Sequence, residues 1–241
     1  MPPLTFAAAF SVSLIGAVIQ AVCGFGYGPV NMSLLPYLFP YAQAVALSGL
    51  CGSTTAVFVA ASSFRYIRWK TVLPCALTAL VFAALSVQLS AGAADGFMVR
   101  SLGAALVALG VYSIFFSGRL RIRPTPRNGT IAGALAGALS GLFSVGGPPM
   151  ALYLLAATDS NDEYRASLNA HFCFTACITT FMRWRNGAFT AATIRAYGLV
   201  LVSLLLGAWI GGKIFRRLDP KRLRLLVYGY LIASGLLMLF K

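Results

Sequence analysis

The chain has 241 residues, of which 59% are hydrophobic and 10% are charged, and its mean hydropathy is +0.82. This composition is typical of polytopic membrane proteins and leaves no stretch polar enough to form a soluble domain. The formal charge of +14 does not predict nucleic-acid binding, because the Lys and Arg residues lie in short loops between apolar runs, as the positive-inside rule describes.

The first apolar run, Leu4–Phe39, contains three glycines and a proline within the six residues Gly24–Pro29. As one helix, its 36 residues would measure about 54 Å at ~1.5 Å per residue. The hydrocarbon layer is only ~30 Å thick. We therefore expect the chain to turn back at the break and form a helical hairpin; a single tilted pass is the alternative.

Three ordinary membrane spans follow the first break, and each is long enough to cross the hydrocarbon. They are Ala42–Phe64, Thr71–Ala91 and Val99–Ser117. A basic linker, residues 119–127, comes next. We assign residues 1–118 to a first transmembrane repeat.

A second break, GLFSVGGPPMALYLL at residues 141–155, echoes the first at an offset of 120 residues. The offset matches Gly26 with Gly146 and Pro29 with Pro149. Three further spans follow, Ala166–Met182, Thr190–Gly212 and Leu223–Phe240. The sequence therefore predicts an all-α membrane protein with a second repeat at 128–241, each repeat holding one broken helix or hairpin and three spans.

The distribution of Lys and Arg distinguishes the hairpin from the single pass. Hairpins place 14 of the 19 basic residues on one side of the membrane, whereas single passes give 11 against 8. Hairpins also make the two repeats inverted. We therefore expect a multi-pass protein of the cell membrane with both termini outside and the linker in the cytoplasm.

Broken helices at matching positions in two halves indicate the binding site of a transporter. Proline suits the first turn of a helix, so Pro29 and the pair Pro148-Pro149 each predict a helix that begins inside the membrane. The free N–H groups and the positive dipole of such a start favour an anion. The five acidic residues lie in predicted loops, so no carboxylate is expected to hold a cation in the membrane. We expect an anion site built without a buried Lys or Arg; tight helix packing is the alternative use of the glycines.

The candidate binding residues lie at or close to the two breaks. They are Gly24, Gly26, Tyr27, Gly28, Pro29, Asn31, Ser144, Gly146, Gly147, Pro148, Pro149 and Tyr153. Asn31 and Ser144 are the strongest polar candidates, although a local cap or a hydrogen bond between helices would explain either equally well. Gln20 and Ser33 are further polar candidates close to the first break.

His171 is the only histidine, and its ordinary pKa of about 6.5 lies near physiological pH. We consider proton coupling through His171; a neutral ring bonded to a neighbouring hydroxyl or carbonyl is the alternative. Arg183 and Arg185, like Arg65 and Arg68, end spans, so we expect them to anchor the protein at the membrane interface rather than to guide the anion.

Other chemistries have weaker signals. Ser140 and His171 could form the Ser–His dyad of an intramembrane protease, but in GALSG the glycine is one position too far from Ser140 for the GxSG pattern of rhomboid proteases. His171, Cys173 and Cys177 have ligand types that suit Zn²⁺, but no matching cluster is present elsewhere in the sequence. We expect no enzyme activity, no metal and no cofactor. The expected partners are a small anionic substrate and membrane lipid, and the oligomeric state stays open.

The stretches GFGYGP and SVGGPP, the four-plus-four duplication and the chain length resemble the TauE/SafE family of sulfite exporters. The resemblance covers essentially the whole chain, with Tyr27 where the family often has glycine and with a double proline at Pro148. It implies a secondary transporter for sulfite or an organosulfonate such as sulfoacetate. A passive anion channel with the same site is the alternative.

Overall fold

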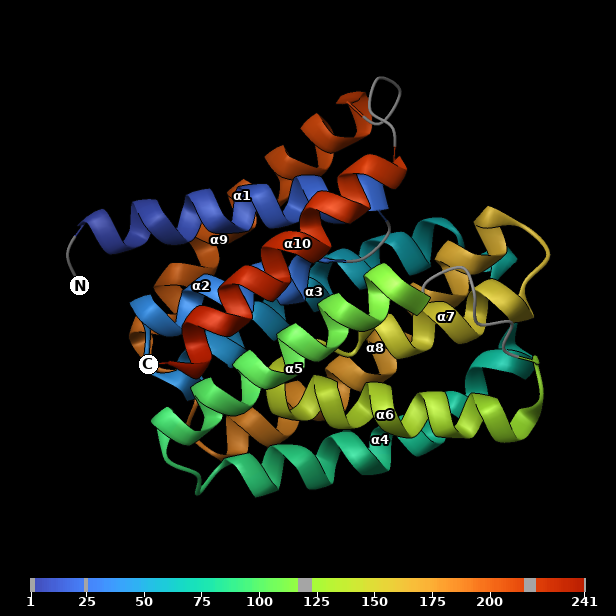
Figure 1. Cartoon of the computed structure of the whole chain (residues 1–241), viewed down its shortest axis with the longest axis horizontal. Coiled ribbons are helices and arrows are strands. Elements are labelled where there is room, and N and C mark those ends of the chain that lie inside the picture. Colours follow the sequence, from blue (N-terminus) through green and yellow to red (C-terminus); the bar gives the residue numbers. More distant parts are fainter. Residues whose placement is uncertain (1–2, 24–25, 117–122, 215–219, 241) are drawn as a thin grey trace.

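The computed structural model describes residues 3–23, 26–116, 123–214 and 220–240, and it is built of helices joined by short loops (Figure 1). The α-helices of the first half are α1 (Pro3–Cys23), α2 (Tyr27–Leu38), α3 (Tyr41–Ser62), α4 (Trp69–Ser90) and α5 (Asp95–Phe116). Those of the second half are α6 (Pro126–Phe143), α7 (Gly147–Ala157), α8 (Asn161–Arg185), α9 (Ala191–Ile214) and α10 (Pro220–Leu239). A short 3₁₀ helix, Phe64–Tyr66, precedes α4.

The predicted all-α class is confirmed, and the protein is a polytopic membrane protein. Among the described residues, four helices are long and apolar enough to cross a membrane: α3, α4, α5 and α9. The expected span within α8 differs from these. It carries buried polar residues along its length, among them Asn169, Thr175 and Arg183, so α8 faces the protein interior more than lipid.

Both predicted breaks are observed, and in each the second helix doubles back along the first. In the first half, Ser13 Oγ of α1 donates to Asn31 Oδ1 of α2 over 2.8 Å. In the second half, a Cβ atom placed on Gly129 of α6 would lie only 2.7 Å from the Tyr153 hydroxyl of α7. Each broken segment is therefore a helical hairpin.

The helices of the two halves pair with each other in an exchanged pattern (Figure 1). α1 packs along α9 at one edge of the molecule and α6 packs along α4 at the opposite edge. α5 packs along α10, and α3 along α8. Each hairpin thus lies against a helix of the other half, and neither half could bury its surfaces alone.

Glycines let the backbones of paired helices touch. In α6, Gly133, Gly137 and Gly141 recur every four residues, so they share one face. A Cβ atom on Gly137 would lie 2.7 Å from the Cα of Ala79 in α4. Small residues at this spacing allow the close helix approach that van der Waals packing in membranes requires. This glycine stripe was not among the features expected from the sequence.

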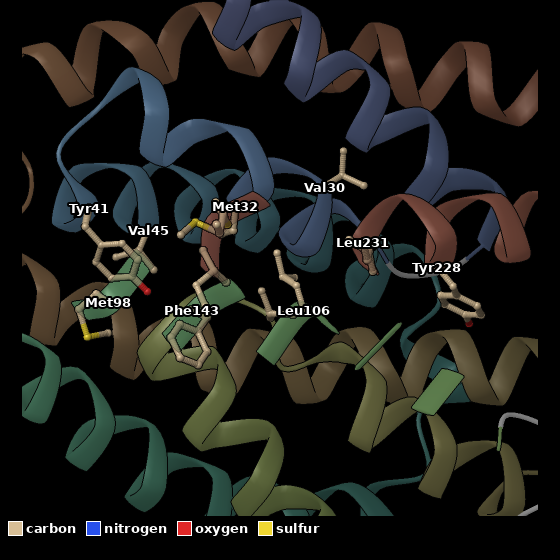
Figure 2. Packing of buried hydrophobic residues seen from close by; sticks show 12 residues of the cluster. Val30, Met32, Tyr41, Val45, Met98, Leu106, Phe143, Tyr228 and Leu231 are labelled. Carbon is tan, nitrogen blue, oxygen red and sulfur yellow. The ribbon is translucent and has the colours of Figure 1, made fainter. Parts of the chain in front are cut away.

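A hydrophobic cluster lies between the first hairpin, α3, α5 and α10 (Figure 2). Met32 of α2, Val45 of α3, Leu106 of α5 and Leu231 of α10 converge there, and Phe143 joins them from the end of α6. The cluster holds the second arm of the first hairpin next to the break of the second. It therefore fixes how the two hairpin tips meet.

Candidate functional site

The short helices of both hairpins begin at the predicted breaks. α2 begins at Tyr27 after Gly26, whose φ of 121° is a conformation that favours glycine. α7 begins at Gly147, and Pro29 and Pro148 lie in the first turns of the two helices, as predicted. Neither start has a side-chain cap, so the N–H groups of these first turns remain available to a ligand.

The two hairpin tips touch through their backbones. A Cβ atom on Gly28, in the first turn of α2, would overlap the carbonyl oxygen of Ser144, at the end of α6. A Cβ atom on Gly146 would overlap the hydroxyl of Ser140 and the carbonyl of Ala136. Glycine at position 28 therefore brings the two breaks into contact, whereas glycine at position 146 lets the second break fold closely against its own helix α6.

A cavity of about 90 Å³ lies where the tips meet, and a single water needs only ~10–15 Å³ of such space. Its walls are the two breaks together with one face each of α3 and α8. The lining residues are Gln20, 26–29, Ser48, Gly49, Gly52, Ser53, Ser140, 144–148, Phe172, Thr175, Ala176 and Thr179. The cavity has room for several waters or one small oxyanion.

The cavity gathers most of the predicted binding residues. Those that line it are Gly26, Tyr27, Gly28, Pro29, Ser144, Gly146, Gly147 and Pro148. Pro149, Tyr153 and His171 are not among the lining residues. Gly24 lies outside the described residues. Gln20, a polar candidate close to the first break, also lines the cavity, as does Ser140, which was considered only as a protease nucleophile.

Asn31, one of the two strongest candidates, lies outside the cavity lining. Its Nδ2 donates to the carbonyl of Tyr27 over 2.9 Å, and its Oδ1 accepts the hydroxyl of Ser13. The amide therefore ties α2 to α1 within the first hairpin. The local hydrogen bonds that the sequence left open as an alternative account for Asn31.

Ser144, the other strong candidate, lines the cavity and joins three helices. Its φ of 56° places it in the left-handed region at the end of α6. Its Oγ donates to the carbonyl of Val45 in α3 over 3.0 Å and accepts from Arg183 Nη1 of α8 over 3.1 Å. Ser144 thus holds the break in place at the cavity wall.

Arg183 corrects two expectations from the sequence. Its side chain is not at an exposed interface but buried, with 4% of the residue exposed. A buried Arg therefore lies beside the site, contrary to the expectation of a site without a buried Lys or Arg. The physical reason is that the last carbonyl groups of α6 keep unused acceptor capacity where the helix breaks. Arg183 Nη2 donates to the carbonyl of Gly141 over 2.9 Å and to that of Ser140, which also accepts the N–H of Ser144, over 2.8 Å. Arg185, two residues later, is exposed.

Ser48 of α3 is a lining residue that the sequence analysis missed. It is buried, and its Oγ has no hydrogen-bond partner among the described residues. Other hydroxyls of α3, such as those of Ser53 and Thr54, bond back to the carbonyl of Leu50. A buried hydroxyl without a partner is costly, so the Ser48 hydroxyl is available to a ligand in the cavity. A single Ser in an apolar span carries no sequence signal that singles it out.

His171 is fully buried on α8, and neither ring nitrogen has a hydrogen-bond partner among the described residues. The bonded neutral ring considered from the sequence is therefore not observed. Proton coupling through His171 stays a prediction. It predicts that His171→Gln flattens the dependence of anion flux on pH, measured in proteoliposomes between pH 5.5 and 8. A wild-type profile in the variant would remove His171 from the mechanism.

The described residues do not form the geometry of a Ser–His protease or of a metal site. Ser140 lines the cavity whereas His171 does not, and the hydrogen bonds of the described residues do not join the two. No group of three or more His, Cys, Asp or Glu side chains in the described part of the chain could hold a metal ion.

Comparison with known proteins identifies the family. The sequence profile of the sulfite exporter TauE/SafE family matches residues 9–238. A probable sulfite/organosulfonate exporter TauE from Cupriavidus necator is 23% identical over 225 residues, which cover 91% of this chain and 88% of that protein. No solved structure gives a significant match. The family consists of membrane exporters and is not an enzyme family. The resemblance of the two glycine-rich breaks is therefore confirmed, and the chain belongs to the TauE/SafE family of sulfite exporters.

Proposed function

We propose that this protein is a secondary transporter that moves a small sulfur-containing anion, sulfite or an organosulfonate, across the cell membrane. The observation that carries the proposal is that two uncapped helix starts, those of α2 and α7, open on one cavity. Membership of an exporter family agrees with this use of the cavity.

The proposed site binds the anion mainly through the protein backbone. The N–H groups of Tyr27, Gly28 and Gly147 lie in the first turns of α2 and α7, where the helix dipoles favour negative charge. Pro29 and Pro148 have no N–H group and shape these turns without needing a partner. The hydroxyl of Ser48 adds a side-chain donor. Such a site needs no cofactor.

Flux of labelled sulfite in proteoliposomes tests the proposal, with thiosulfate, sulfate, sulfoacetate and taurine as competitors. We expect saturable flux that rises when unlabelled sulfite is present on the opposite side, because exchange through a carrier shows trans-stimulation. Flux without saturation or trans-stimulation would favour the passive anion channel. The absence of flux of any of these anions in folded protein would overturn the substrate class.

We further propose that residues 1–118 and 128–241 are inverted repeats, joined by the cytoplasmic linker 119–127, with both termini outside. α2 and α7 begin 120 residues apart, as do α3 and α8, and the exchanged helix pairs support the same relation. Alternating access would come from one repeat moving against the other around the hairpin tips. Cysteines introduced near Thr125 and at the C-terminus should be labelled from opposite faces of the membrane; labelling from one face would contradict the inversion.

Ser48→Ala is expected to raise the KM for the anion roughly tenfold or more, because a hydrogen bond to a charged group contributes about 1.5–3 kcal/mol. The thermal stability of the variant should stay at the wild-type value, since the hydroxyl has no partner among the described residues. Ser62→Ala on the same helix is the matched control, because the Ser62 hydroxyl bonds back to Val59. An unchanged KM in Ser48→Ala would remove this hydroxyl from the site.

A further inference from the structure

The guanidinium of Arg183 closes the broken end of α6. Its three hydrogen bonds to Ser140, Gly141 and Ser144 use Nη1 once and Nη2 twice. The hydroxyl of Tyr41 donates to the next carbonyl, that of Leu142. These bonds explain why an Arg fork is needed at the end of α8. They do not explain what balances its charge.

No carboxylate neutralises Arg183 within the described part of the chain. Asp159 and Glu163 pair with Arg68, at 2.6 and 3.3 Å. Asp95 accepts the backbone N–H of Tyr41 over 3.3 Å, and Asp162 lies in the first turn of α8, at the opposite end of the helix from Arg183. The negative end of the α6 dipole is equivalent to only about half an elementary charge. The described residues therefore leave the larger part of the positive charge of Arg183 unbalanced.

This charge lies directly behind the cavity wall. A Cβ atom on Gly49, which lines the cavity, would be 2.6 Å from Nη1 of Arg183 and 3.1 Å from the Ser144 hydroxyl. Gly49 therefore leaves the guanidinium room against α3. Nη1 carries two N–H groups and makes one hydrogen bond among the described residues, so one of its donors has no partner there.

We propose that Arg183 supplies the fixed positive charge that gives the cavity its anion selectivity, and that it makes the site prefer dianions to monoanions of the same size. The proposal rests on the transport of a sulfur-containing anion proposed above. The physical reason is that Coulomb attraction to a fixed charge scales with the charge of the ligand. The two helix starts supply only partial charges, so a full cation in a buried wall dominates the discrimination.

The test uses two organosulfonates of nearly equal size and different charge, the dianion sulfoacetate and the monoanion 2-hydroxyethanesulfonate, with sulfite as a third probe. Their affinities for the purified full-length protein are measured from ligand-dependent thermal unfolding. Arg183→Gln should weaken sulfoacetate binding roughly a hundredfold and 2-hydroxyethanesulfonate binding roughly tenfold, so that the preference falls by about a factor of ten. Arg183→Lys, which keeps the charge and loses the fork, should lower the thermal stability yet retain the preference.

Two further variants make the result decisive. Arg185→Gln removes the same formal charge two residues away, on an exposed side chain, and should leave both affinities unchanged. Gly49→Ala forces the guanidinium away from the cavity without removing it, and should reduce the preference even if Arg183→Gln does not fold. Wild-type preference in Arg183→Gln, or in Gly49→Ala where Arg183→Gln cannot be purified, would overturn the proposal. So would the failure of all three probes to bind the wild-type protein.

Binding and flux separate this proposal from the proposed function. If the wild-type protein prefers the dianion through Arg183 but moves no anion in proteoliposomes, the transport proposal is overturned and the role of the Arg183 charge in selectivity is supported. If the protein transports the anion with saturation but Arg183→Gln keeps the wild-type preference for the dianion, the transport proposal is supported and the role of Arg183 in selectivity is overturned.

Discussion

Gly28→Ala is expected to abolish most of the transport activity. The added methyl group would occupy the position of the Ser144 carbonyl oxygen, which belongs to the backbone of the second break and cannot rotate away as a side chain can. Overpacking of this kind costs about 1–3 kcal/mol, which corresponds to a roughly 5- to 150-fold loss in an equilibrium between site-forming and site-broken states. Saturable sulfite flux in proteoliposomes, at matched amounts of folded protein, measures the effect.

Gly198→Ala is the matched control for this substitution. Gly198 lies inside α9, and nothing lies within 4 Å of a Cβ atom placed there. The same chemical change should leave flux at the wild-type level and add slightly to stability, because alanine is the better helix former by roughly 0.5–1 kcal/mol. Wild-type flux in Gly28→Ala would show that the two hairpin tips do not need to touch for transport.

Gly137→Val is expected to disrupt the pairing of α6 with α4, and so the fold itself. The Cβ atom would lie 2.7 Å from the Cα of Ala79, and the two γ-methyl groups would need still more space between the backbones. Valine has a better intrinsic helix propensity than glycine, so any loss reports packing rather than helix formation. We expect the midpoint of thermal unfolding in detergent to fall by roughly 2–12 °C, from an overpacking cost of about 1–3 kcal/mol.

Leu135→Val on the same helix separates the packing effect from a general effect of valine. Leu135 is 53% exposed and points away from α4, so its replacement should leave the midpoint of unfolding unchanged. Equal stability of Gly137→Val and the wild-type protein would mean that the backbones of α4 and α6 are not in contact. The same outcome would remove the physical basis of the exchanged helix pairs.

The positions of the broken helices followed from the sequence because their causes are local. Proline fixes its own φ and lacks an N–H group, and glycine accepts conformations such as the φ of Gly26. These effects act within a few residues, so α2 and α7 begin within two residues of where Pro29 and Pro148 predict. The bounds of α3, α4, α5 and α9 were also close to prediction, because hydropathy and length define a membrane span.

The side chains of the site did not follow from the sequence in the same way. Asn31 and Ser48 are both polar residues in apolar helices, and the sequence favours Asn31 because it is nearer to a break. The structure instead bonds Asn31 to Ser13 and Tyr27 within the hairpin. The hydroxyl of Ser48 lies at the cavity and has no partner in the part of the chain that the structure describes. Which way a polar side chain of a helix points depends on the neighbouring helix, and periodicity alone does not identify that neighbour.

The sequence by itself determined the all-α membrane class, the two breaks and the family. Each of these features can be identified from composition, hydropathy or a short glycine–proline motif, without knowledge of contacts between distant residues. The tertiary structure alone decided that α1 pairs with α9 and α6 with α4, that the two breaks touch, and that Arg183 lies behind the cavity instead of at the membrane surface. These features arise from contacts between residues far apart in the chain. Their free energy depends on how glycine faces, carbonyl groups and a guanidinium fit together in space, and that fit exists only once the helices have packed.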